Sequence, residues 1–140
     1  VGQIESPLEA FVNPSSFKIY QADTGLLVSK AGAQRADILS GIGGTFMGAL
    51  TENYVAQQLS AIGYPLHYWA RDNRAEIDFV VERQGCVSAI EVKAGENTRS
   101  RSLSSLKKSH PGVRRIRLST KPFGMNDGLM SVPLYAAFCL

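Results

Sequence analysis

The sequence predicts a single α/β domain in which helices flank a mixed central sheet, with elements in the order helix, three strands, helix, strand. A long segment with apolar residues every three to four positions, 45–62, is followed by three short strand-like runs. A shorter helical pattern and one more strand-like run complete the order. With 140 residues, 44% hydrophobic and 19% charged, the chain has the composition of one soluble domain with a sizeable core.

The first strong element is an amphipathic helix over 45–62. Gly63 is placed to end it, because glycine readily adopts the left-handed conformation that follows many helices. The helix carries a single acid, Glu52, in its first half. Its apolar side chains are Phe46, Met47, Leu50, Tyr54, Leu59 and Ile62.

The residues before this helix are predicted to form a peripheral segment and joint, 1–44, ahead of the core, 45–140. Residues 17–20 resemble a short strand, and Asp23 is suited to cap a helix or turn. The glycines within 41–44 lack the Lys-Ser/Thr that completes a phosphate-binding P-loop. They favour a hinge or a loop that leads into the helix instead. The opening residues show no apolar period, which is typical of a piece of a longer protein whose preceding domain is missing.

Three strand-like runs follow the helix and are predicted to form an antiparallel meander. They cover 66–70, 76–82 and 86–94, and the turn formers at 83–85 join the last two. Further along, 102–110 is expected to be a short helix and 113–118 a strand. The apolar end of the chain, 132–140, is expected to supply a last edge strand or a helix that covers the core.

Charge and cysteines narrow the functional classes only slightly. A net charge of +3 and a pI near 9 permit contact with nucleic acid but do not require it. The chain has neither an apolar run long enough to cross a bilayer nor the layout of a signal peptide, so we expect a cytoplasmic protein without a membrane. Cys86 and Cys139 lack a CxxC spacing and are predicted to be buried free thiols.

Acidic and basic side chains interrupt the second and third strand-like runs. Successive side chains of a strand point to opposite faces, so Glu91 and Lys93 share one face. On the preceding strand, Ile77, Phe79 and Val81 form the apolar set, which puts Asp78 on the other face. A hairpin that turns through 83–85 then brings Asp78 roughly opposite Glu91.

Two converging carboxylates repel each other, and a hard divalent cation relieves that repulsion best. We therefore predict a Mg²⁺ or Mn²⁺ site with Asp78, Glu91 and Glu52 as ligands. Asp78, Glu91 and Lys93 would be its catalytic residues, because phosphodiester hydrolysis needs a cation and a group that orients or deprotonates water. The competing interpretation is an ordinary cross-strand ion pair between Asp78 and Lys93 on a solvated face.

Several segments together resemble the DUF4143 family, and the resemblance covers most of the chain. They are 17–20 (FKIY), 23–27 (DTGLL), 52–55 (ENYV), 68–69 (YW), 75–80 (AEIDFV) and 90–93 (IEVK). The family forms the carboxy-terminal domain of bacterial and archaeal AAA+ type ATPases. Its fold is similar to the restriction-endonuclease-like PD-(D/E)xK core, so the resemblance implies that the missing front part is the ATPase.

The resemblance also implies a role for individual residues. Asp78 would be the aspartate of the motif, Glu91 and Lys93 its Glu-x-Lys, and Glu52 the helical acid. One departure is that Ile77 stands where the motif has proline. These assignments agree with the site predicted from strand alternation.

The predicted function is therefore metal-dependent hydrolysis of DNA phosphodiester bonds by a domain that follows an AAA+ ATPase. The alternative is a noncatalytic module that binds nucleic acid or protein and regulates that ATPase. Association into a homo-oligomer is compatible with either. A basic stretch is expected to follow the phosphate backbone, although a solvated face explains it about as well; the residues assigned to it are Arg99, Arg101, Lys107 and Lys108.

Overall fold

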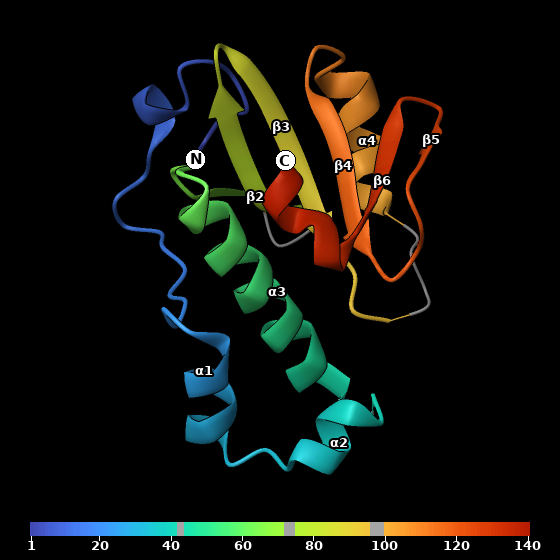
Figure 1. The fold of residues 1–140 in the computed structure, drawn as a ribbon. Helices are drawn as coiled ribbons and strands as arrows, with labels where there is room; N and C mark the ends of the chain where they lie inside the picture. Colours follow the sequence, from blue (N-terminus) through green and yellow to red (C-terminus); the bar gives the residue numbers. More distant parts are fainter. Residues whose placement is uncertain (42–43, 72–74, 96–99) are drawn as a thin grey trace.

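The computed structural model describes residues 1–41, 44–71, 75–95 and 100–140. They form a six-stranded mixed sheet in the order β1-β2-β3-β4-β6-β5, with helices on both faces (Figure 1). The predicted α/β class with a mixed, helix-flanked sheet is confirmed. The strands are β1 (His67–Arg71), β2 (Ala75–Arg83), β3 (Cys86–Val92), β4 (Arg114–Ser119), β5 (Gly124–Asn126) and β6 (Leu129–Pro133).

The helical elements agree with the sequence pattern where that pattern is strong. The long helix α3 spans Gly44–Ala61 and α4 spans Arg101–Ser109. Gly63 ends α3 as predicted, with φ of 87° and its N–H donating to the Ser60 carbonyl at 3.0 Å. The remaining elements are α1 (Thr24–Ala31), α2 (Arg35–Leu39) and two 3-10 helices, η1 (Leu8–Phe11) and η2 (Leu134–Cys139).

The first three strands form the predicted antiparallel meander, and β4 then pairs in parallel with β3 after the crossover through α4. The end of the chain differs from the prediction. Val132 lies in β6, which is inside the sheet, and the edge position belongs to β5. A hairpin at Asp127 and Gly128, both with positive φ, joins these two strands. Residues 134–139 form η2 and cover part of the core, as a terminal helix was expected to do.

The two faces of the sheet carry separate hydrophobic cores. On one face, α3 and η2 pack against strand residues such as Phe79, Ile90 and Leu118. On the other face, Leu103 and Leu106 of α4 pack against Ile77, Val80 and Ala89. Figure 1 shows α3 crossing in front of the sheet and α4 behind it.

The opening residues contribute to the second core, which the sequence pattern did not indicate. Ile4 and Leu8 are only 1% and 2% exposed, and both pack in the α4-side core. Their spacing matches no regular period because the backbone here is irregular apart from η1. Sequence periodicity therefore could not identify them.

The strand predicted at residues 17–20 does not exist, since this segment belongs to no sheet. Residues 17–24, termed the strap below, instead lie along α3. The buried Asn53 accepts from the Gln21 N–H at 2.8 Å and donates to the Gln21 carbonyl at 3.1 Å. Because α3 side chains satisfy these backbone groups, the segment needs no strand partner.

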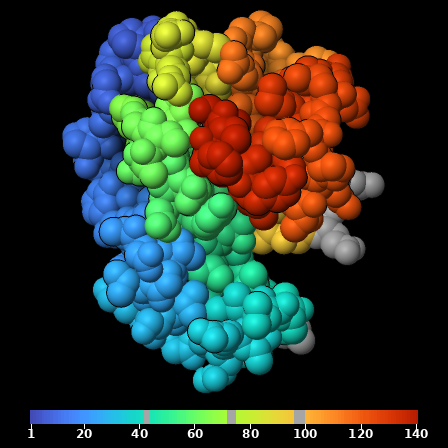
Figure 2. Space-filling view, viewed as in Figure 1, coloured from blue at the N-terminus to red at the C-terminus, as the bar shows by residue number. Residues whose placement is uncertain are grey.

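The strap leads into α1, and Asp23 caps this helix as expected, accepting from the Leu26 N–H at 3.0 Å. Neither α1 nor α2 contains a buried residue. Figure 2 shows these two helices, in blue to teal, protruding from the body that the sheet and its cores form. Leu39 at the end of α2 is 79% exposed.

Both cysteines are free, but the prediction that they are buried is wrong: Cys86 and Cys139 are exposed. Cys86 is the first residue of β3, directly after the hairpin turn, and Cys139 ends η2. Each lies where its element meets solvent. Within the described ranges, no helix has both the length and the apolar character needed to cross a membrane.

Candidate functional site

The β2–β3 hairpin brings the two central acids onto neighbouring strands. The register pairs Arg83 with Cys86 and continues without a shift to Phe79 and Ile90. Asp78 and Glu91 are the next residues along the two strands, one position beyond this last pair. The Asp78 carboxylate reaches across to β3, where its Oδ2 accepts the Val92 N–H at 2.7 Å.

A β-bulge precedes this point on β2. His67 pairs with Val80 but Trp69 pairs with Ile77, so two residues of β2 oppose one residue of β1. The side chain of Ile77 consequently packs in the α4-side core, whereas Phe79 packs in the α3-side core. The prediction that Ile77, Phe79 and Val81 share one face is therefore wrong. Asp78 lies in the bulge, where the regular alternation of the strand is interrupted.

Asp78 is half-buried and electrostatically unfavourable as an anion. Burial raises its pKa to about 6, and the negative charges of Glu52 and Glu91 act in the same direction. The hydrogen bond from Val92 and the charge of Lys18 lower the pKa, but less strongly. A cation beside Asp78 would remove this penalty, because it would stabilise the ionised carboxylate.

Glu91 and Lys93 stand two residues apart near the end of β3. The Lys93 ammonium lies 2.6 Å from Glu91 Oε1, and the Glu91 side chain is only 8% exposed. Its second oxygen, Oε2, is buried and has no hydrogen-bond partner among the described residues. Beyond Val92 the backbone stays attached to the sheet, since the Lys93 N–H donates to the Leu118 carbonyl at 2.8 Å.

Glu52 faces the sheet from α3 but is already engaged. Its Oε1 accepts from Tyr20 Oη at 2.6 Å and from Lys18 Nζ at 2.9 Å. The same lysine also forms an ion pair with Glu76 of β2. Burial and the adjacent Glu52 raise the pKa of Tyr20, so its hydroxyl stays protonated and donates.

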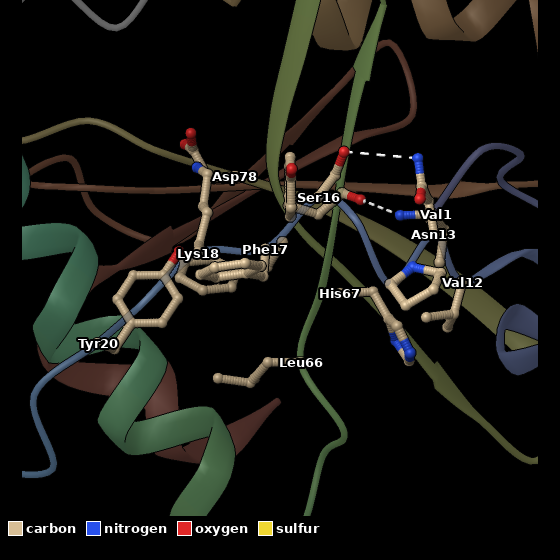
Figure 3. Close-up of a pocket in the computed structure, with 13 residues that line it drawn as sticks. Val1, Val12, Asn13, Ser16, Phe17, Lys18, Tyr20, Leu66, His67 and Asp78 are labelled. Carbon is tan, nitrogen blue, oxygen red and sulfur yellow. Dashed lines mark hydrogen bonds between the residues drawn. The ribbon is translucent and has the colours of Figure 1, made fainter.

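Lys18, Tyr20 and Glu76 were missed by the sequence analysis. The available signal was the alternation within the predicted strand at 17–20, where polar tips two residues apart interrupt an apolar run. Figure 3 shows Lys18, Tyr20 and Asp78 on the same side of a cavity of about 450 Å³. The aromatic rings that line it are those of Phe17, Tyr20, Tyr68 and Phe79.

The three residues predicted to bind a metal are only partly brought together. Among the residues that the structure describes, no group of three His, Cys, Asp or Glu side chains is arranged to hold a metal ion. Asp78 and Glu91 offer carboxylate oxygens of the kind that Mg²⁺ and Mn²⁺ prefer, including Oε2 of Glu91, which has no partner among the described residues. In their chemistry these two carboxylates fit such a cation, whereas Glu52 is held by Lys18 and Tyr20.

The predicted phosphate-binding residues are divided between the two ends of α4. Arg101 is exposed in the first turn, and Lys107 and Lys108 are exposed in the last, where Lys107 pairs with Asp127. Because α4 connects the parallel strands β3 and β4, its first turn follows the end of β3 that carries Glu91. The two lysines lie roughly 10 Å farther along the helix axis. Arg99 lies outside the described residues.

Comparisons with known proteins identify one family. The sequence model of DUF4143, described as a domain of unknown function, matches residues 47–137, which is more than half of the chain. The searches of curated proteins and of solved structures each returned no match. The matched range includes Glu52, Asp78, Glu91 and Lys93, and begins after the strap.

Proposed function

Because the chain belongs to the DUF4143 family, we propose that it is a nuclease-fold domain that hydrolyses phosphodiester bonds of DNA with Mg²⁺ or Mn²⁺. The fold in this proposal is the restriction-endonuclease-like PD-(D/E)xK core. The domain would be the carboxy-terminal part of an AAA+ ATPase, which would move or remodel the nucleic acid. Asp78 and Glu91 would hold the cation, and Lys93 would act on the water or the scissile phosphate.

The proposal rests chiefly on Glu91 Oε2, which is buried and has no hydrogen-bond partner among the described residues, one position beyond the last β2–β3 pair. An unpaired carboxylate oxygen in a buried position is costly unless a ligand satisfies it. If these residues formed only an ordinary ion pair on a solvated face, this oxygen would be in contact with water. The pKa of Asp78, which is raised mainly by burial, is a further reason to expect a cation beside this carboxylate.

The residues of the chain would divide the work as follows. A bound divalent cation neutralises charge on the scissile phosphate and lowers the pKa of the attacking water. The Val92 N–H holds Asp78 in orientation, and the other carboxylate oxygen, which accepts no hydrogen bond from the described residues, would bind the cation. The Lys93 ammonium, which pairs with Glu91 from just past the end of β3, donates to the water or to a phosphate oxygen. Arg101 is the described basic residue of α4 nearest this end of the sheet, and it would hold the DNA backbone.

One observation favours the alternative, a noncatalytic module that binds nucleic acid or protein and regulates the ATPase. Glu52 and Glu76 are each paired with Lys18, and Glu91 is paired with Lys93, so much of the acidic charge is balanced without a metal. Lysines that satisfy carboxylates permanently would preserve the fold after the loss of catalysis.

Cleavage of DNA by the purified protein tests the proposal. We expect cutting that requires Mg²⁺ or Mn²⁺ and disappears in Asp78→Ala and Lys93→Ala. Asp37→Ala is the matched control for the acid and Lys30→Ala for the lysine, since both residues are exposed and lie on the protruding helices. DNA binding without any cutting, under a full range of divalent cations, would support the regulatory alternative instead.

A further inference from the structure

The Lys18 ammonium lies among carboxylates, although residue 18 itself belongs to no helix or strand. Its ammonium lies 2.9 Å from Glu52 Oε1 and also pairs with Glu76, so it bridges α3 and β2. The side chain is largely shielded, with 24% exposed, and it lies 5.3 Å from the centre of the Tyr68 ring. Burial lowers its pKa, but the two acids more than offset this, so the pKa is raised and the amine stays charged.

The strap fixes the lysine in this position. Asn53 holds the Gln21 backbone through both its N–H and its carbonyl. Gln57, one turn farther along α3, accepts from the Thr24 hydroxyl at 2.8 Å and from its N–H at 3.2 Å. Tyr20 adds its hydrogen bond to Glu52 at 2.6 Å. Lys18 is therefore presented by an anchored backbone rather than by a loosely attached side chain.

The charges around the site suggest why a lysine is placed there. Lys18 is the described cation that pairs with Glu52 and Glu76, and the charges of Lys18, Glu52 and Glu91 act on Asp78. Without Lys18, the carboxylates of Glu52 and Glu76 would have no described cationic partner, and a divalent cation between them would relieve the same repulsion.

We propose that the Lys18 ammonium occupies the place of a second metal ion, and so limits the site to a single divalent cation between Asp78 and Glu91. Lys18 is then a positioning residue: it holds Glu52 and Glu76 apart from the catalytic cation. The inference rests on the proposed function for the first cation only. The place that Lys18 itself fills is defined by its own contacts.

Manganese binding tests this without any substrate. Electron paramagnetic resonance of free Mn²⁺ gives the number of ions bound to the purified protein. We expect Lys18→Met, and independently the polar variant Lys18→Gln, to bind one Mn²⁺ more than the wild type. Adding Glu76→Gln to Lys18→Met should remove the extra ion, because one of its two carboxylates is lost. Lys30→Met is the control, since Lys30 belongs to the exposed helix α1 and should leave the number unchanged.

A second measurement needs no variant. Acetylation of the wild-type lysines, followed by mass spectrometry, should find Lys18 protected relative to Lys30 with and without saturating Mn²⁺. Equal Mn²⁺ binding by the wild type and both Lys18 variants would overturn the inference, and so would exposure of Lys18 to acetylation on saturation with Mn²⁺. A wild type that binds no Mn²⁺ beside a Lys18→Met variant that binds one would uphold the inference and remove the cation of the proposed function.

Discussion

The site contains two lysine–glutamate pairs that differ in the length of chain between their members. Glu91 lies at the end of β3 and Lys93 two residues farther along, just past the strand, whereas Lys18 and Glu52 are 34 residues apart, on the strap and on α3. Strand alternation alone brings the first pair together. The second pair exists only when the strap docks on α3. One half of the site is therefore a local property of β3, and the other half depends on tertiary structure.

The largest expected effect concerns the local half. Lys93→Met should lower the rate of DNA cleavage by about 100-fold or more, because an acid–base or charge-stabilising group is lost. It should leave Mn²⁺ affinity nearly unchanged, since lysine is not a ligand. Asp78→Asn should instead weaken Mn²⁺ binding, because an amide oxygen is a poorer ligand for a hard cation. Titration calorimetry on both variants, beside the cleavage assay, separates the two roles. Equal losses of Mn²⁺ affinity would contradict this division.

A smaller effect is expected from Asp78, which lies between the two halves of the site. It should appear in the free energy of unfolding without metal. The folded-state pKa of Asp78 is raised from 3.8 to about 6, so the folded protein binds more protons than the unfolded chain between these pH values. The stabilisation of the folded state by this extra proton on Asp78 is fully present below pH 4 and is lost as pH rises through 6. We expect Asp78→Asn to be more stable than the wild type by about 3 kcal/mol at pH 8 in chelator. The difference should shrink toward pH 4.

Urea unfolding of both proteins across this pH range gives the comparison. Asp37→Asn, at an exposed acid of α2, is the control for the loss of one surface charge. An Asp78→Asn variant that is less stable than the wild type at pH 8 would show that the site does not strain the fold. Added Mn²⁺ should stabilise the wild type more than the variant, because the ion binds the ionised carboxylate of the folded state.

The docking of the strap on α3 can be weakened without changing β3. Asn53→Ala removes two hydrogen bonds to the Gln21 backbone in a buried position, so it should lower the free energy of unfolding by about 2 kcal/mol. Hydrogen exchange of the Gln21 amide should accelerate, while the amides of β3 should change only with global stability. Gln58→Ala, at a partly buried position of the same helix, is the control, because the described α3 bonds to Thr24 come from Gln57. Equal acceleration in β3 would contradict the separation of the two halves.

The smallest effect is expected where the strap meets α1. Asp23→Ala removes the cap on the Leu26 N–H and should cost about 1 kcal/mol of local helix stability. Since α1 buries no residue, the loss should appear as faster hydrogen exchange within Thr24–Ala31 and hardly at all in the global unfolding midpoint. Asp23→Asn retains an acceptor and should behave like the wild type. A large global destabilisation by Asp23→Ala would mean that α1 is part of the cooperative core.

Sequence reasoning worked where local periodicity decides the structure. It located α3 with its Gly63 stop, the β1–β3 meander, and the turn of the β2–β3 hairpin. It failed where contacts with residues far away in the sequence determine the local structure. Residues 17–20 have a strand pattern, yet hydrogen bonds from α3 side chains to the neighbouring strap backbone take the place of a sheet.

The bulge in β2 shows a second limit. Alternation assigned Ile77 to the face of Phe79, and the extra residue reverses that assignment. A bulge without glycine leaves no mark in the composition of a strand, so only the pairing with β1 reveals it. Likewise the burial of Ile4 and Leu8 follows from where an irregular segment crosses the sheet, which no sequence period encodes.

Because Asp78 lies in the bulge, the chain could lose this acid without losing the fold of the sheet. The pairing of β2 with β1 shifts by one residue along the strand, whereas its pairing with β3 does not. Asp78 lies at this shift. Deleting this single residue would join the two registers into an uninterrupted strand, with the same order of elements and no carboxylate opposite Glu91. Relatives with a one-residue gap at this position would therefore be expected to keep the scaffold and lose the acid. In an alignment, the length of β2 would separate the two kinds of domain before any comparison of residue identity.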